Sequence, residues 1–265
     1  MLEQTLEHRK QTALQFVQTL AIPAPKPLLT AQESLTLLDS TQAGAAVNDQ
    51  SVVCFVEGLN AQLKSDVLNS TLLAQLAASA KFPRDPNTFQ YNVVGWYNCY
   101  TETLQKVGWN IQGLSFSQHG VSGSTFQVNE VVMQLLAGMV THSAGLIVQS
   151  ALEALDVAKV KAKESRALTL WKSHTDTDAN GSFQVACCSE SEGCAAMALG
   201  AFYMTSRNKI RHVLWCDYSS SDTNVQCAST QVVLNNDVYS VVRSAVSQKL
   251  GTAAASFIAD LDIGL

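Results

Sequence analysis

Three of the seven cysteines in this 265-residue chain lie close together, and their thiols are the first groups to consider for chemistry. The segment FQVACCSESEGCAAMALGAF, from Phe183 to Phe202, contains Cys187, Cys188 and Cys194. Clustered thiols can form disulfides, bind a metal ion, act as nucleophiles or pack in a core as small apolar groups. The residues around them decide among these four roles.

The cysteine spacing favours neither a disulfide framework nor structural zinc. No two cysteines are separated by two residues, as they are in the CxxC pairs of zinc sites. The adjacent residues Cys187 and Cys188 cannot form an unstrained disulfide, because their Cα atoms lie too close together. The first residues lack the basic start and apolar run of a signal peptide, so we expect seven reduced thiols.

The motif DTDANG, from Asp176 to Gly181, matches the first half of an EF-hand calcium loop. Oxygen ligands occupy alternate positions, and the glycine permits the sharp turn of such a loop. The twelfth position, where a glutamate should complete the coordination shell, is Cys187. We therefore expect a turn between a helix and a strand, with no strong calcium site and no other metal.

No catalytic signature is present in the sequence. It lacks the GxSxG nucleophile elbow, the GxxxxGK[ST] phosphate loop, the GxGxxG turn and the HExxH zinc motif. A Cys–His catalytic pair stays open, since its members need only meet in space. Burial in an apolar strand would, however, raise the pKa of a cysteine and make it inert. The histidines are far apart in the chain, at His8, His119, His142, His174 and His212.

The composition indicates a sizeable core and argues against nucleic acid as a partner. Apolar residues make up 47% of the chain and charged residues 15%, below the roughly 25% typical of soluble domains. The net charge is -5, and no basic patch stands out. No stretch has the eighteen or so uncharged apolar residues of a transmembrane helix. Membrane contact would therefore need a lipid or a surface patch.

Apolar periodicity predicts the elements that position the cysteines. Residues 1–108 have mostly helical spacing, and residues 109–265 mix helices with strands. One strand is predicted at 109–118, and the others are SFQVACCSE, AAMALGAFYMTS, IRHVLWCDYS and NVQCASTQVVLN. We predict a single α+β domain over 1–265, with an antiparallel sheet of about five strands flanked by helices.

Small side chains surround the clustered cysteines. Small side chains that face each other would either pack very closely or leave room for a long, thin group. Close packing is the usual outcome, since protein interiors are normally filled. The small residues in these strands are Ala186, Ser189, Ala195, Ala196, Ala198, Gly200 and Ala201.

Four segments together resemble the Erwinia virulence factor (Evf) family, bacterial proteins linked to persistence in the insect gut. The segments are NVVGWYNCYTETLQKVGWNIQG, FQVNEVVMQLL, FQVACCSESEGCAAMALGAFYM and VVLNNDVYSVVRSAV. They lie within about residues 90–250, and the resemblance rests on the order of the elements and on sparse motifs.

The resemblance implies an α/β domain that holds palmitate as a thioester on a buried cysteine, where the acyl group serves membrane association. The matching position is the cysteine directly before Ser-Glu, here Cys188. This chain departs from the pattern because Cys187 lies beside it, which makes Cys187 the alternate attachment site. Successive strand residues point to opposite faces, so only one of the two thiols faces a given side. The implied cofactor is covalently bound palmitate, and the implied partners are a fatty acid and membrane lipids.

Three hypotheses about function follow. The leading one is an acylated, toxin-like virulence or host-interaction protein, not an enzyme, that associates with membranes and promotes persistence in an insect gut. The second is a cysteine-dependent acyl-transfer or thioesterase-like enzyme, in which the thioester is an intermediate. The third is a protein-interaction domain with a filled core. We expect the protein to be cytoplasmic in the producing cell and to reach membranes, or to be released, without a conventional signal peptide.

Overall fold

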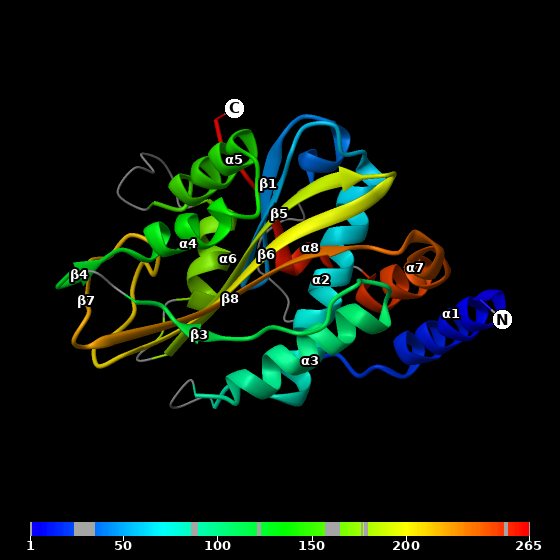
Figure 1. Cartoon of the computed structure of the whole chain (residues 1–265), viewed down its shortest axis with the longest axis horizontal. Coiled ribbons are helices and arrows are strands. Elements are labelled where there is room, and N and C mark those ends of the chain that lie inside the picture. Colours follow the sequence, from blue (N-terminus) through cyan, green and yellow to red (C-terminus); the bar gives the residue numbers. More distant parts are fainter. Residues whose placement is uncertain are drawn as a thin grey trace.

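The centre of the molecule is a seven-stranded mixed sheet with helices on both faces (Figure 1). The strand order is β3-β8-β6-β5-β2-β1-β9, and β2 and β5 are its parallel neighbours. A separate two-stranded sheet pairs β4 with β7. This computed structural model describes residues 2–23, 35–85, 90–120, 123–156, 165–175, 177, 180–251 and 254–264.

The strands differ widely in length, and the three longest are neighbours in the sheet. These are β5 (Asn180–Ser191), β6 (Cys194–Ser206) and β8 (Thr223–Val233). The others in the large sheet are β1 (Gly44–Asn48), β2 (Ser51–Phe55), β3 (Ser117–Gln118) and β9 (Ile258–Leu261). The small sheet consists of β4 (Thr125–Phe126) and β7 (Tyr218–Ser219).

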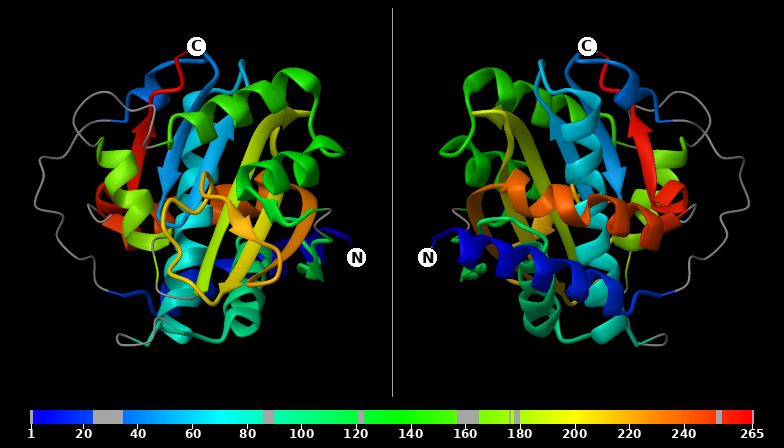
Figure 2. Two further views of the ribbon diagram at one scale, coloured as in Figure 1. Left: turned by 90° about the vertical axis from the view of Figure 1, so that its left-hand side faces the viewer. Right: turned by 90° about the vertical axis from the view of Figure 1, so that its right-hand side faces the viewer.

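The helices form two layers, one on each face of the sheet (Figure 2). One layer contains α2 (Ala61–Lys81), α3 (Val93–Lys106) and α7 (Asn236–Leu250), with α1 (Leu2–Thr19) packed along α7. The opposite layer contains α4 (Val128–Ala137), α5 (His142–Glu153) and α6 (Arg166–Thr175). Two short elements complete the chain, the 3-10 helix η1 (Thr36–Asp39) and α8 (Ala254–Phe257).

The hairpin of β5 and β6, which carries all three clustered cysteines, is formed by local sequence. Its two-residue turn is Glu192–Gly193, and both residues have positive φ, at 51° and 76°. Such a turn matches the right-handed twist of the paired strands, and glycine adopts it without strain. The predicted strands SFQVACCSE and AAMALGAFYMTS are confirmed as parts of β5 and β6. NVQCASTQVVLN is confirmed as part of β8 except for its last two residues, because β8 ends at Val233.

The predicted antiparallel sheet of about five strands is wrong, because the sheet has seven strands and is mixed. The predicted helical character of residues 1–108 also fails where β1 and β2 form a hairpin. Every residue of both strands is buried, since helices cover the two faces. Such strands show no apolar–polar alternation that would separate them from a buried helix. The run SVVCF, which contains β-branched residues and follows a two-residue turn, was the feature of the sequence that indicated a strand.

Two other predicted strands are also corrected. Within IRHVLWCDYS only Tyr218–Ser219 forms a strand, and the rest is irregular chain that buries Val213 and Leu214 against α4 and α5. Within 109–118 only Ser117–Gln118 forms a strand, at the edge of the sheet, and Trp109 makes an isolated antiparallel bridge to Leu234.

Candidate functional site

Strand β5 turns the two adjacent thiols to opposite faces of the sheet. Cys188 belongs to the apolar cluster under α2, α3 and α7, and Cys187 belongs to the cluster under α4, α5 and α6. Their exposed fractions are 0% and 5%. The predicted orientation of the two thiols is confirmed, and Cys194 is the first residue of β6. Because helices cover both faces, burial alone does not decide which thiol is the better attachment point.

Cys188 lies in apolar surroundings built from three elements. Its register partners are Phe55 in β2 and Met197 in β6, and both side chains belong to the same cluster as Cys188. Tyr100 of α3 belongs to that cluster too. Burial raises the pKa of its hydroxyl, and the charge of ionised Cys188 would raise this pKa further. Burial raises the pKa of the Cys188 thiol well above its usual value. A thiol that stays neutral is a poor nucleophile.

The residues around Cys188 fit a covalently held hydrocarbon chain in their chemistry. The cluster is apolar, and the small residues Ala186 and Ala195 lie on the same face of the sheet. Met197 has an unbranched, flexible side chain that adapts to irregular space. A fatty acyl thioester needs a thiol and an apolar enclosure, and this face offers both. Cys188, Ala186, Met197 and Tyr100 are therefore the residues that would hold it.

On the opposite face, Cys187 lies beside Cys54 of β2, its register partner in the parallel strand pair. The Sγ atom of Cys187 lies 4.0 Å from the carbonyl oxygen of Ala144 in α5. Burial raises the pKa of Cys187 to about 11 and that of Cys54 well above its usual value. All seven cysteines are free thiols. The fold thus adds Cys54, which is distant in sequence, to the adjacent pair.

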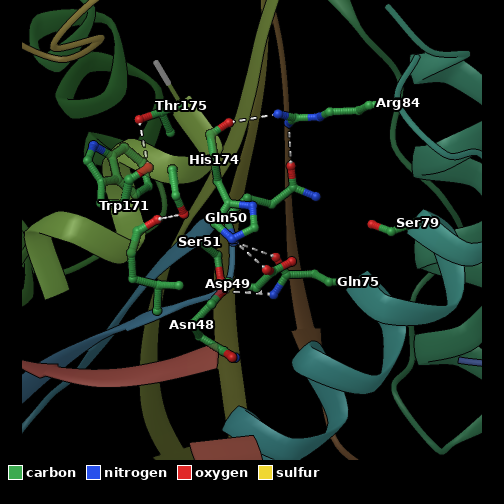
Figure 3. A network of polar contacts seen from close by, with 12 residues as sticks. Asn48, Asp49, Gln50, Ser51, Gln75, Ser79, Arg84, Trp171, His174 and Thr175 are labelled. Carbon is green, nitrogen blue, oxygen red and sulfur yellow. Dashed lines mark hydrogen bonds and ion pairs between the residues drawn. The ribbon is translucent and has the colours of Figure 1, made fainter. Parts of the chain in front are cut away.

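A buried polar network at the β1–β2 turn was not found by sequence reasoning (Figure 3). Asp49, with φ of 55°, and Gln50 form this turn, and both are almost fully buried. The Asp49 carboxylate lies 3.1 Å from Nε2 of His174 in α6. On the other side, Gln75 of α2 donates to the carbonyl of Asn48 at 3.0 Å and accepts from the backbone N–H of Gln50 at 3.2 Å. The turn is therefore held by α2 and α6 together.

Arg84 extends this network from the segment after α2. Its guanidinium donates to the carbonyl of His174 at 2.9 Å and to Oε1 of Gln50 at 3.0 Å, and it lies over the ring of Tyr91. The Tyr91 hydroxyl in turn is hydrogen-bonded to Ser182 at the start of β5. The network therefore connects the β1–β2 turn, α6 and β5 through side chains that are far apart in the sequence.

The chemical capacity of the network is limited by what its hydroxyls already bind. An Asp–His pair can orient a general base, but such a base needs a nucleophile within hydrogen-bond reach. Ser51 donates to the carbonyl of Asn48 at 2.8 Å, and Ser182 is bonded to Tyr91. In the part of the chain that the structure describes, the contacts of His174 join it to Asp49 and Arg84. The arrangement positions the turn and provides no activated nucleophile.

Metal binding and membrane spanning find no support among the described residues. No group of three or more His, Cys, Asp or Glu side chains there could hold a metal ion. Asp176, Asp178 and Ala179 of the DTDANG motif lie outside the described residues, so the expectation for that motif stays a prediction. No helix within the described ranges is both long and apolar enough to cross a membrane.

Two pockets with largely apolar linings lie between helices. One, of about 450 Å³, lies between α1, α2 and α3, and its lining includes Phe16 and Cys99. The other, of about 330 Å³, lies between α4 and α5, and its lining includes Met133 and Leu146. Cys188 lines neither pocket.

Comparisons with known proteins find likenesses among solved structures alone. No family model and no curated protein matches the chain. A delta-endotoxin structure matches with 14% identity over 81% of this chain and 90% of that chain, at a TM-score of 0.33. The activated Cyt2Ba monomer from Bacillus thuringiensis subsp. israelensis matches with 15% identity over 71% of this chain and 97% of that chain, at a TM-score of 0.31. The Evf virulence factor matches with 12% identity over 81% of this chain and 85% of that chain, at a TM-score of 0.34. The family that the sequence resembles is therefore among these likenesses.

Proposed function

We propose that this chain is an acylated, toxin-like virulence or host-interaction protein that associates with membranes and promotes persistence in an insect gut. The acyl group is a palmitoyl thioester on Cys188, and the protein is not an enzyme. The observation that carries the proposal is the position of Cys188. It occupies the motif position that the family resemblance assigns, and it is fully buried in an apolar cluster under three helices.

The free energy of burying such a chain accounts for both storage and release. About fifteen methylene groups at roughly 0.8 kcal/mol each give an upper limit of ~12 kcal/mol. A contribution of that size holds a hydrocarbon chain inside the protein in water. This free energy of burial is matched only when a comparable apolar phase, such as a lipid bilayer, accepts the hydrocarbon chain. Membrane association therefore follows from the same group that stabilises the fold.

The burial of Cys188 also dictates when the thioester forms. The folded thiol has no exposed surface and a raised pKa, so it reaches an acyl donor only while β5 is still uncovered. Transfer from an acyl thioester donor creates the carbon–sulfur bond to Cys188 and releases the donor's thiol, which requires no oxidant or reductant. An acyl-transfer enzyme, the second candidate, would instead need a thiolate that its substrate can reach in the folded state.

Intact-mass measurement of the protein purified from the producing bacterium tests the proposal. We expect an addition of palmitoyl size that neutral hydroxylamine removes from the unfolded protein, that is absent from Cys188→Ser and that remains in Cys187→Ser. An adduct that survives in Cys188→Ser and vanishes in Cys187→Ser would place the acyl group on the other face of the sheet. A wild-type protein without any adduct would refute the proposal.

A further inference from the structure

The stretch from Val107 to Leu152 is almost free of charge. It contains one Asp, Glu, Lys or Arg, namely Glu130, although 15% of the whole chain is charged. In the fold this stretch supplies β3, β4, α4 and nearly all of α5. Moving a charged side chain into or against a low-dielectric phase costs free energy. A surface without charges can therefore approach such a phase at the lowest cost.

The helix pair α4–α5 presents this uncharged sequence on the outside of the molecule (Figure 2, left). Leu146 of α5 is 49% exposed and is the largest of the four exposed large apolar side chains among the described residues. The half-buried residues Met133, Met139 and Val140 lie on α4 and on the turn between the helices. Met133, Val140 and Leu146 also line the pocket of about 330 Å³. We call Met133, Met139, Val140 and Leu146 the neutral face.

We infer that the neutral face is a lipid-contact surface that lies on a membrane of zwitterionic phospholipid. The inference rests on the membrane association proposed above and names the surface that takes part in it. A single acyl chain gives only marginal, reversible membrane binding, so stable attachment needs a second contribution. Apolar burial of the neutral face is that contribution.

The amino-acid composition of α4 and α5 favours lipid over protein as the partner of the neutral face. Protein interfaces take most of their binding energy from Trp, Tyr and Arg, and neither α4 nor α5 contains any of these. Neither helix contains Lys, and the chain as a whole carries -5, so an anionic surface gains no attraction. The carboxylates on this helix pair, Glu130 in the first turn of α4 and Glu153 at the end of α5, lie far along the helices from the turn.

Vesicle flotation with phosphatidylcholine tests the inference through a matched pair of variants. Leu146→Glu places a charge on the neutral face, and Val94→Glu places one on α3 in the opposite helix layer, where Val94 is 67% exposed. We expect Leu146→Glu to lower the vesicle-bound fraction by about fivefold or more, and Val94→Glu to leave it unchanged. Wild-type binding should vary little with salt, since no charges drive it. Thermal unfolding confirms that both variants are folded.

A fluorescence readout locates the contact directly. When the protein binds vesicles, the emission of the tryptophan introduced by Leu146→Trp should shift to the blue and be quenched by a lipid-attached quencher. The tryptophan introduced by Val94→Trp should show neither change. Equal flotation of Leu146→Glu and Val94→Glu would overturn the inference. So would a dimer that Leu146→Glu dissociates without affecting vesicle binding, because the face would then serve a second copy of the chain.

The Cys188→Ser background separates this inference from the proposed function. If Leu146→Glu still lowers flotation in Cys188→Ser, the neutral face is a lipid contact whether or not the protein is acylated. If Cys188→Ser abolishes flotation while Leu146→Glu has no effect in the acylated protein, acyl-dependent association stands and the neutral face is refuted.

Discussion

The carboxylate of Asp49 lies 3.1 Å from Nε2 of His174, and this contact joins the β1–β2 turn to α6. The Asp49 side chain is 5% exposed, whereas that of His174 is 28% exposed. A carboxylate with so little access to water depends on its protein donors to remain in the core. The pair therefore supports the position of β2, the parallel neighbour of the strand that carries Cys188.

Replacing His174 by alanine should destabilise the protein by about 1–3 kcal/mol, because the buried Asp49 carboxylate loses its imidazole partner. Urea unfolding followed by circular dichroism measures the loss. His8→Ala, which removes an exposed imidazole from α1, is the control and should leave the unfolding midpoint unchanged. Equal midpoints for both variants would show that the Asp49–His174 contact contributes nothing to stability.

Arg243 of α7 holds a second buried carboxylate. Its Nε and Nη2 atoms donate to Asp66 of α2 at 2.9 Å and 2.8 Å, and the Asp66 side chain is 1% exposed. Arg243→Met should cost about 3 kcal/mol or more, since it leaves an uncompensated charge in the core. The double variant Arg243→Met with Asp66→Leu should recover part of that loss, which a double-mutant cycle measures.

The exposed pair of Arg207 and Asp222, 3.5 Å apart, is the matched control for this cycle. Arg207→Met should cost less than about 1 kcal/mol, because water screens the pair and already solvates both partners. A similar loss of stability in both arginine variants would contradict the assignment of the larger cost to burial.

The cysteines should differ sharply in their reactivity toward a maleimide in the native protein. Cys99, Cys194 and Cys216 are partly exposed and should be labelled first. Cys187 and Cys188 should be labelled only as fast as the protein unfolds, because burial blocks access and keeps both thiols neutral. Peptide mass mapping after timed quenching gives the order. Early labelling of Cys188 in the unacylated protein would contradict the burial described here.

Stability should fall in alkaline solution from about pH 9 upward. Burial raises the pKa of Cys187 to about 11 and that of Cys54 well above its usual value. As pH rises above about 9, these thiols lose protons in the unfolded chain and keep them in the folded protein. The unfolded state then binds fewer protons, so the free energy of unfolding decreases with pH.

Urea unfolding at about pH 8 and about pH 10 measures this dependence. The double variant Cys54→Ala with Cys187→Ala should show a smaller decrease between the two conditions than the wild type does. An unchanged decrease would mean that other groups cause the alkaline loss of stability.

Local sequence determined the part of the fold that carries the cysteines. The two strand-like runs of β5 and β6 and the short connection that contains Glu192 and Gly193 indicate a hairpin from neighbouring residues alone. The opposite orientation of Cys187 and Cys188 follows from the period of two along a strand, which holds in any sheet. The absence of a CxxC pair was equally a property of spacing, independent of the fold.

Only the tertiary structure decided the rest. Strands β1 and β2 are buried on both faces, so their sequences carry no alternation, and the parallel pairing of β2 with β5 depends on distant chain segments meeting. The same assembly brings Cys54 beside Cys187 and His174 to Asp49. These contacts are set by sheet order and helix packing, because no local pattern relates residues that become neighbours only when both faces of the sheet are covered.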